Sequence, residues 1–252
     1  MALSSAAQPP PSNGVGVDGC RAGWFAVWQA GTGTAYRQYA TIAEVWQGHP
    51  SADTILVDIP MGLTNSQPRL LEPAMRRLLG RKSSSVFPVP CRDAVYAPDF
   101  ATACTENLAR FGKKVSIQAF NICAKIQEMD QLLRSDPQAR NVFGESHPEL
   151  VFSMLGGSLV VSSKKQSAGI EARLTILESY RPELRSVYRS ALSSYPRSHV
   201  ARDDIVDAMA LFVAAVSVRQ LDVKTEIGEG GVPIRLFIPS RESLLFSPDF
   251  IC

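Results

Sequence analysis

The sequence predicts an α/β protein whose sheet opens with three antiparallel strands and continues with strands that alternate with helices. GVGVDG and GWFAVWQA near the N-terminus have strand-forming compositions and are joined by a tight glycine turn at 19–23. After residue 40 short apolar strands alternate with helical patterns, which is typical of parallel sheets. The 252 residues, 45% hydrophobic and 20% charged, suffice for a normal core.

The individual elements follow from local spacing and from glycine and proline signals. Strands are expected at 15–19, 23–30, 35–41, 54–60, 141–146 and 234–239. Helices are expected at 41–49, 72–80, 99–110, 116–134, 147–155, 169–180 and from about Asp204 to Val218. We therefore expect one domain over 14–252 with a helical insertion around 64–140, preceded by a disordered tail at 1–13.

Composition excludes several classes of protein. The net charge of +2 is too small to imply a polyanionic partner without local clustering. The five cysteines are scattered and lack a C-x-x-C pair, so neither a disulfide framework nor a zinc knuckle is expected, and a reducing, cytoplasmic location fits best. The start of the chain lacks the features of a signal or transit peptide. The longest apolar run, 208–216, is about half of a membrane span.

The glycines at 14, 16 and 19 have the spacing of a dinucleotide-binding turn but the wrong context. That turn needs a strand before the glycines and a helix after them. Here a proline-rich tail precedes Gly14, and the strand-like CRAGWFAVWQ follows Gly19. The spacing is therefore a coincidence, and the glycines beside Asp18 permit close approach of a phosphate or a metal. The alternative is that Asp18 only begins a hairpin.

Acidic residues lie where other predicted elements end or begin. Asp58 ends one strand and Glu145 ends another, while Asp203, Asp204 and Asp207 open a helix that is apolar almost all round. Helix capping explains one or two aspartates at a helix start, but less easily one within an apolar helix. A buried carboxylate needs a partner, and neighbouring acids repel unless a divalent cation lies between them. The pattern favours Mg²⁺ or Mn²⁺.

Five separated motifs, in order and spacing, resemble domain-of-unknown-function family 429, whose members are described as predicted ribonuclease H-like nucleases. The motifs are GVDGCRAGW, ILVDIPMGL, RKSSSVFPVPCR, ESHPELVF with the following SSKKQSAG, and DDIVDAMA. The resemblance covers about residues 14–240. It implies a ribonuclease H-like fold, a five-stranded mixed sheet with three antiparallel and then two parallel strands, flanked by helices.

The resemblance also implies site residues. Asp18 is similar to the first-strand aspartate that bridges two metals in the ribonuclease H superfamily, and Asp207 to the last acidic motif of Holliday-junction resolvases. Either Glu145 or Asp58 is then the middle carboxylate; we favour Glu145, with Asp58 supporting the ligands. The implied metal ligands are Asp18, Glu145, Asp204 and Asp207. Two departures, Cys91 where proline is expected and Ser146 within ESHPE, remove no acid.

Such a site predicts metal-dependent hydrolysis of a phosphodiester. Two divalent ions about 4 Å apart activate water and stabilise the leaving oxygen. His147 could act as a proton shuttle, although a histidine before proline equally often only begins a helix.

Basic residues cluster where a phosphate backbone could bind. The segment 69–92 contains six basic residues and one acidic residue, Glu72. The candidate substrate-binding residues are Arg21, Arg76, Arg77, Arg81, Lys82, Arg92, Lys164 and Lys165. A solvated surface is the alternative interpretation of these charges.

We therefore expect a metal-dependent nuclease that binds nucleic acid, with no membrane contact and with a homodimer as one possible state. A second hypothesis is metal-assisted hydrolysis or transfer on a small, phosphorylated metabolite. A third is a binding module that uses the acids only as caps and acceptors. An actin-like or sugar kinase is disfavoured because 252 residues are short for two domains and no second glycine-rich hairpin is present.

Overall fold

The computed structural model describes residues 13–216, 218–224 and 226–240, and the expected tail before residue 13 lies outside them. A five-stranded mixed sheet has the order β3-β2-β1-β4-β5. The first three strands are antiparallel, and β4 and β5 are parallel to β1, as expected. The strands are β1 (Gly14–Cys20), β2 (Gly23–Ala30), β3 (Gly33–Tyr39), β4 (Thr54–Val57) and β5 (Phe143–Glu145).

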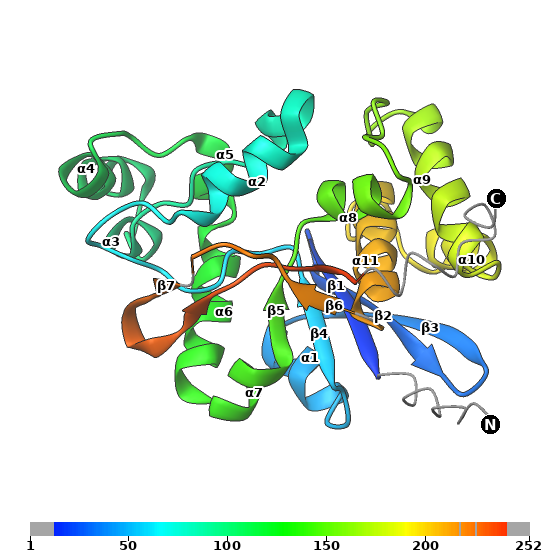
Figure 1. The fold of residues 1–252 in the computed structure, drawn as a ribbon. Helices are drawn as coiled ribbons and strands as arrows, with labels where there is room; N and C mark the ends of the chain where they lie inside the picture. The colour runs from blue at the N-terminus through cyan, green and yellow to red at the C-terminus, as the bar shows by residue number, and fades with distance from the viewer. Residues whose placement is uncertain (1–12, 217, 225, 241–252) are drawn as a thin grey trace, which may run out of the picture.

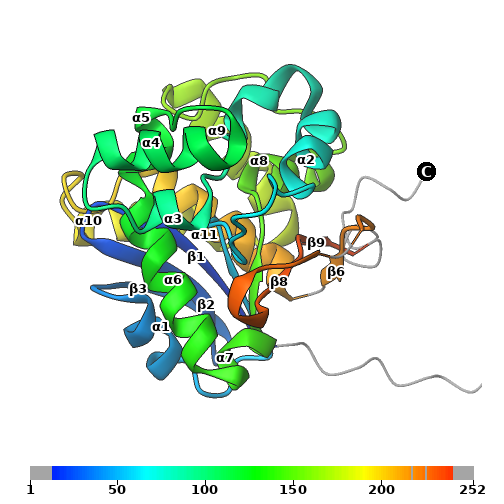
Figure 2. The same ribbon diagram turned by 90° about the vertical axis from the view of Figure 1, so that its left-hand side faces the viewer.

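Helices cover both faces of the sheet (Figures 1 and 2). One face packs on α1 (Ile42–Gly48), α6 (Cys123–Ser135) and α7 (Pro137–Val142). The other packs on α8 (Pro148–Leu155), α9 (Ser167–Tyr180), α10 (Leu184–Ser194) and α11 (Arg202–Ala215). No helix among the described residues is long and apolar enough to cross a membrane.

The long connection between β4 and β5 forms a further helical layer beyond the carboxyl ends of the strands (Figure 1). It contains α2 (Leu71–Leu79), the 3₁₀ helix η1 (Gly80–Ser85), α3 (Arg92–Val95), α4 (Phe100–Phe111) and α5 (Ile117–Asn121), followed by α6 and α7. The helix predicted over 116–134 divides at Ile122, which caps both α5 and α6. Small buried side chains of α3, α4 and α5 form a minor core of their own.

Two small ribbons complete the described chain. The strand β6 (Val218–Gln220) pairs with β9 (Phe237–Pro239), and β7 (Glu226–Ile227) pairs with β8 (Pro233–Ile234) across the 3₁₀ helix η2 (Glu229–Gly231). The strand expected at 234–239 is thus split between β8 and β9, and it touches the main sheet at a bridge from Leu236 to Glu145. No element was predicted for the stretch that forms α10.

The central contact joins the first strand to the last helix. Side chains alternate along a strand, so Gly14, Gly16 and Asp18 share the face of β1 that meets α11. A Cβ on Gly16 would lie 2.0 Å from the amide nitrogen of Phe212 and 2.2 Å from the carbonyl oxygen of Ala208. The absence of side chains at these glycines allows the helix backbone to lie directly on the strand, with the acidic start of α11 beside Asp18.

Substitution of Gly16 should therefore lower the free energy of unfolding much more than the same substitution at another glycine of the sheet. We expect Gly16→Ala to lower the free energy of unfolding by about 3 kcal/mol or more, because main-chain atoms must move apart. Gly33→Ala in β3 is the control, since its Cβ would meet nothing closer than 3.9 Å, and its change should stay within about 1 kcal/mol. Urea unfolding measures both; equal losses would contradict the close contact.

Candidate functional site

A pocket lies at the carboxyl ends of β1, β4 and β5. In parallel α/β sheets this edge is the usual place for a ligand. The pocket has a volume of ≈ 250 Å³, and its walls include Asp18, Asp58, Glu145, His147 and Asp204. Side chains that the sequence analysis selected from four separate segments therefore meet at one cavity.

Four aspartates form what we call the acid cluster: Asp18, Asp58, Asp204 and Asp207. Asp18 is 8% exposed and Asp207 only 1%. Burial, followed by the charges of Asp207, Asp58 and Asp204, raises the pKa of Asp18 well above its ordinary value. Burial also raises the pKa of Asp58 and Asp204. The fold therefore holds together carboxylates that repel one another.

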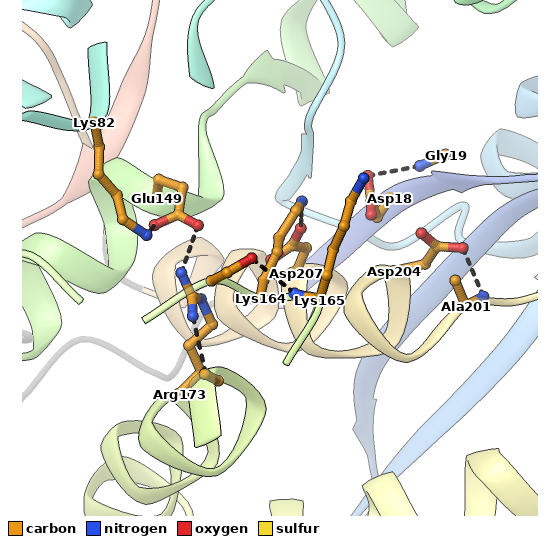
Figure 3. A network of polar contacts seen from close by, with 12 residues as sticks. Asp18, Gly19, Lys82, Glu149, Lys164, Lys165, Arg173, Ala201, Asp204 and Asp207 are labelled. Atoms are coloured by element: carbon orange, nitrogen blue, oxygen red, sulfur yellow. Dashed lines mark hydrogen bonds and ion pairs between the residues drawn. The ribbon is translucent and has the colours of Figure 1, made fainter. Parts of the chain in front are cut away.

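The Lys164 ammonium lies within the acid cluster. It donates a hydrogen bond to Oδ2 of Asp207 (Figure 3). Burial lowers the pKa of Lys164, but the charges of Asp207 and Asp18 outweigh it and leave this pKa above its ordinary value. Burial raises the pKa of Asp207 to about 6 although Lys164 opposes the shift. Oδ1 of Asp207 is buried and has no hydrogen-bond partner.

Asp204 combines a structural contact with its place at the pocket. Its Oδ2 accepts a hydrogen bond of 2.8 Å from the amide of Ala201 at the start of α11. Helix capping therefore accounts for part of its role, as the alternative interpretation of the sequence proposed. It does not account for Asp207, which lies one turn further along the buried helix.

Glu145 belongs to a different group of charges. Nη2 of Arg69 donates to both of its oxygens, at 2.7 and 2.8 Å, and the amide of Met61 donates at 2.8 Å. Glu72 completes the group, 3.0 Å from the same Arg69 nitrogen. Burial raises the pKa of Glu145 to about 7 despite Arg69. Asp58 thus interacts electrostatically with Asp18, whereas Glu145 is held by Arg69.

His147 lines the pocket directly before α8. It occupies the N-cap position of that helix, and its Nδ1 is buried without a hydrogen-bond partner. Its charged form is among the influences that lower the pKa of Asp58, after the larger, opposite effect of burial. His147 therefore begins a helix and also lies beside the acid cluster.

A second polar network, which the sequence analysis did not identify, supports the loop that carries Lys164. Arg173 is fully buried and donates to Oε1 of Glu149 at 2.5 Å, while Lys82 binds the other oxygen of Glu149 at 3.0 Å (Figure 3). Arg173 also donates to the carbonyl oxygens of Ser162 and Gly169, at 3.1 and 2.9 Å. The available sequence signal was an arginine at helical spacing among the apolar positions of α9.

Three of the eight predicted basic residues, besides Lys164, have partners within the chain. Arg76 donates to the carbonyl of Val86, Lys82 binds Glu149 and Arg92 pairs with Asp130 at 2.9 Å. Four of the candidates are exposed: Arg21, Arg77, Arg81 and Lys165. These four remain available for an external anion, whereas the three partnered residues first stabilise the wall of the pocket.

Lys125 is a pocket residue that the sequence analysis missed. It extends from α6, donates to the carbonyl of Gly23 at 2.5 Å and lies 4.5 Å from the centre of the Trp24 ring. Burial lowers its pKa. In the sequence Lys125 resembles any polar residue of a helix that packs against the sheet, so no local pattern indicated its place at the pocket.

The fold and site together define an α/β protein with a carboxylate-lined pocket at the carboxyl edge of a mixed sheet. The family model described as "Protein of unknown function (DUF429)" matches residues 16–226, and the chain belongs to this family. No curated protein and no solved structure gives a significant match to it.

The raised pKa of Asp207 predicts a specific pH dependence of stability. The folded protein holds this proton up to about pH 6, whereas the unfolded chain releases it near 3.8, so rising pH through this window lowers the free energy of unfolding. The loss through this group is about 2–3 kcal/mol. The Asp207→Asn variant lacks this titration but keeps that of Glu145. Its free energy of unfolding should therefore fall less than that of the wild type over the same pH range. Parallel pH profiles in denaturant unfolding would contradict the shift.

Proposed function

We propose that the protein is a divalent-metal-dependent hydrolase that cleaves phosphodiester bonds of nucleic acid, with a ribonuclease H-like arrangement of acids. The observation that carries the proposal is the convergence of Asp18 and Asp58, at the carboxyl ends of adjacent strands, with Asp204 and Asp207 in the first turns of α11. Such a concentration of buried carboxylates is costly for the fold unless a cation compensates it. It is typical of sites that bind Mg²⁺ or Mn²⁺.

The chemistry of the donors fits a hard divalent cation. As they lie, no three Asp, Glu, His or Cys side chains of the described chain are grouped as a metal centre, and Lys164 is the cation that contacts the acid cluster. The buried Oδ1 of Asp207 lacks any partner, so a ligand oxygen is available. The four aspartates would hold the ion. When bound, it would supply an acidified water and neutralise charge on a phosphoryl group.

The residues around the acid cluster have separable roles in this proposal. His147 lines the pocket, has an unpartnered Nδ1, and moves a proton to or from the reacting oxygens. The exposed Arg77 and Arg81 contact phosphates outside the pocket. Arg69 neutralises Glu145 and thereby limits the negative charge that an incoming phosphate meets.

Hydrolysis of a small phosphorylated metabolite is the second candidate function. Two observations favour it: half of the eight predicted phosphate contacts are partnered internally, and the ≈ 250 Å³ pocket has an apolar wall. That wall includes Met75, Val86, Phe87, Val89 and Ile122. A cavity of this size and composition suits one compact organic group better than a duplex.

The thiol chemistry supports a location in a reducing compartment, which we propose to be the cytoplasm. The four cysteines within the described residues are free and buried. Burial raises the pKa of Cys20, the one nearest the acids, to about 11. This thiol therefore stays protonated at neutral pH, and we assign it no nucleophilic role.

Replacement of Asp18 tests the catalytic assignment. Asp18→Asn should reduce Mn²⁺-dependent cleavage at least about a hundredfold, because a charged ligand is lost where charge develops. Asp203→Asn is the matched control: it makes the same chemical change on α11 but does not line the pocket, and should keep activity within about threefold. Labelled DNA and RNA strands, duplexes and junctions, together with phosphorylated metabolites, are the substrates. Full activity of Asp18→Asn would exclude this role.

The exposed arginines distinguish the two candidate substrates. Arg77→Ala with Arg81→Ala should weaken nucleic-acid binding and reduce the slope of log K against log salt by about 2. Arg189→Ala with Arg197→Ala removes the same charge from exposed positions on and after α10 and should leave the slope unchanged. Fluorescence anisotropy at several salt concentrations measures this. Equal slopes in all three proteins would favour the small metabolite.

A further inference from the structure

We propose that Lys164 is an exchangeable counter-ion of the acid cluster, so that its ammonium group and a divalent cation bind these carboxylates in competition. The inference rests on the proposed metal-dependent function and concerns the step that prepares its site. It starts from the hydrogen bond between Lys164 and Asp207 and from the effect of Asp18 and Asp58 on the same ammonium. Lys164 thus holds the position that a metal ion needs.

The neighbouring cations are directed elsewhere. Lys125 also lines the pocket, but its ammonium binds the carbonyl of Gly23 and lies against Trp24. Lys82 binds Glu149, and Lys165 is exposed in the loop. Among these lysines, Lys164 is the one with a hydrogen bond to the acid cluster, so its departure would uncover Asp207 as a ligand.

The loop around Lys164 is built so that the ammonium can move while the main chain stays in place. One guanidinium nitrogen of Arg173 binds the carbonyl oxygens on both sides of the lysine, at Ser162 and Gly169. Gly169 packs so closely that a Cβ there would lie 1.9 Å from the carbonyl oxygen of Ser163. The Lys164 side chain is 34% exposed and has four rotatable bonds, so rotation alone gives the ammonium access to solvent.

The exchange also gives the displaced ammonium a second use. Lys164 lines the same pocket as Asp18 and Asp58, so after it leaves Asp207 its charge remains at the pocket wall. A phosphate oxygen of the substrate is the anion that this position suits. Removing Lys164 should therefore strengthen binding of the metal alone, an effect opposite to that of removing a ligand.

Titration calorimetry with Mn²⁺ alone tests the competition. We expect Lys164→Gln to bind Mn²⁺ about tenfold to a hundredfold more tightly than wild type, the range for one lost charge-assisted hydrogen bond. Lys165→Gln is the matched control, because it removes the same charge from the next residue; it should change the affinity less than about threefold. A mildly alkaline buffer keeps the carboxylates ionised.

Thermal unfolding gives a second readout that requires no turnover. In EDTA, Lys164→Gln should melt below wild type because Asp207 loses its partner, and Mn²⁺ should raise its Tm by more than it raises that of wild type. Equal or weaker Mn²⁺ binding by Lys164→Gln, beside clear binding by wild type, would overturn the exchange and leave the metal site intact. Absence of Mn²⁺ binding by all three proteins would overturn the proposed function as well.

Discussion

The direct contact between β1 and α11 is the constraint on which the site depends. Gly14 and Gly16 bring the helix backbone onto the strand, and the two-residue repeat of the strand then points Asp18 at the start of α11. Asp207 is buried for the same reason. The acids are thus neighbours because of close packing and despite their charges, since electrostatic repulsion alone would separate them. A slightly greater distance between helix and strand would remove both the repulsion and the site.

Three separate groups of cations balance the buried carboxylates at and beside the pocket. Arg69 forms ion pairs with Glu145 and Glu72, and Lys164 forms one with Asp207. Arg173 and Lys82 both pair with Glu149. The first and third of these groups involve an almost fully buried guanidinium, whereas the second relies on a flexible lysine of a surface loop. Arg69 and Arg173 are therefore fixed cations, and Lys164 is the cation that a metal ion can replace. This division separates the carboxylates that maintain the fold from those that can accept a ligand.

The succession of three antiparallel and then two parallel strands, and the positions of the main acids, could be predicted from sequence because both leave local patterns. Asp18 lies near the end of one apolar strand, Asp58 directly follows another, and Asp207 interrupts an apolar helix. The pairing of Glu145 with Arg69 could not be predicted, because it joins residues 76 positions apart. Likewise, Arg76, Lys82 and Arg92 resemble free charges in sequence, yet each has a partner that only the folded chain provides. The helix α10 was missed although its apolar positions 184, 187, 188 and 191 have helical spacing.

The same contact between the first strand and the last helix has a consequence for biosynthesis. The strand β1 leaves the ribosome long before α11, whose contact surface ends at Ala215, so the carboxylates come together only after α11 has also been made. Contacts so distant in sequence form slowly, because the intervening chain must first be ordered. Until then one face of the β-meander is an uncovered apolar surface that a chaperone could recognise. A truncated chain that ends before α11 would lack both the cover for this surface and half of the acid cluster.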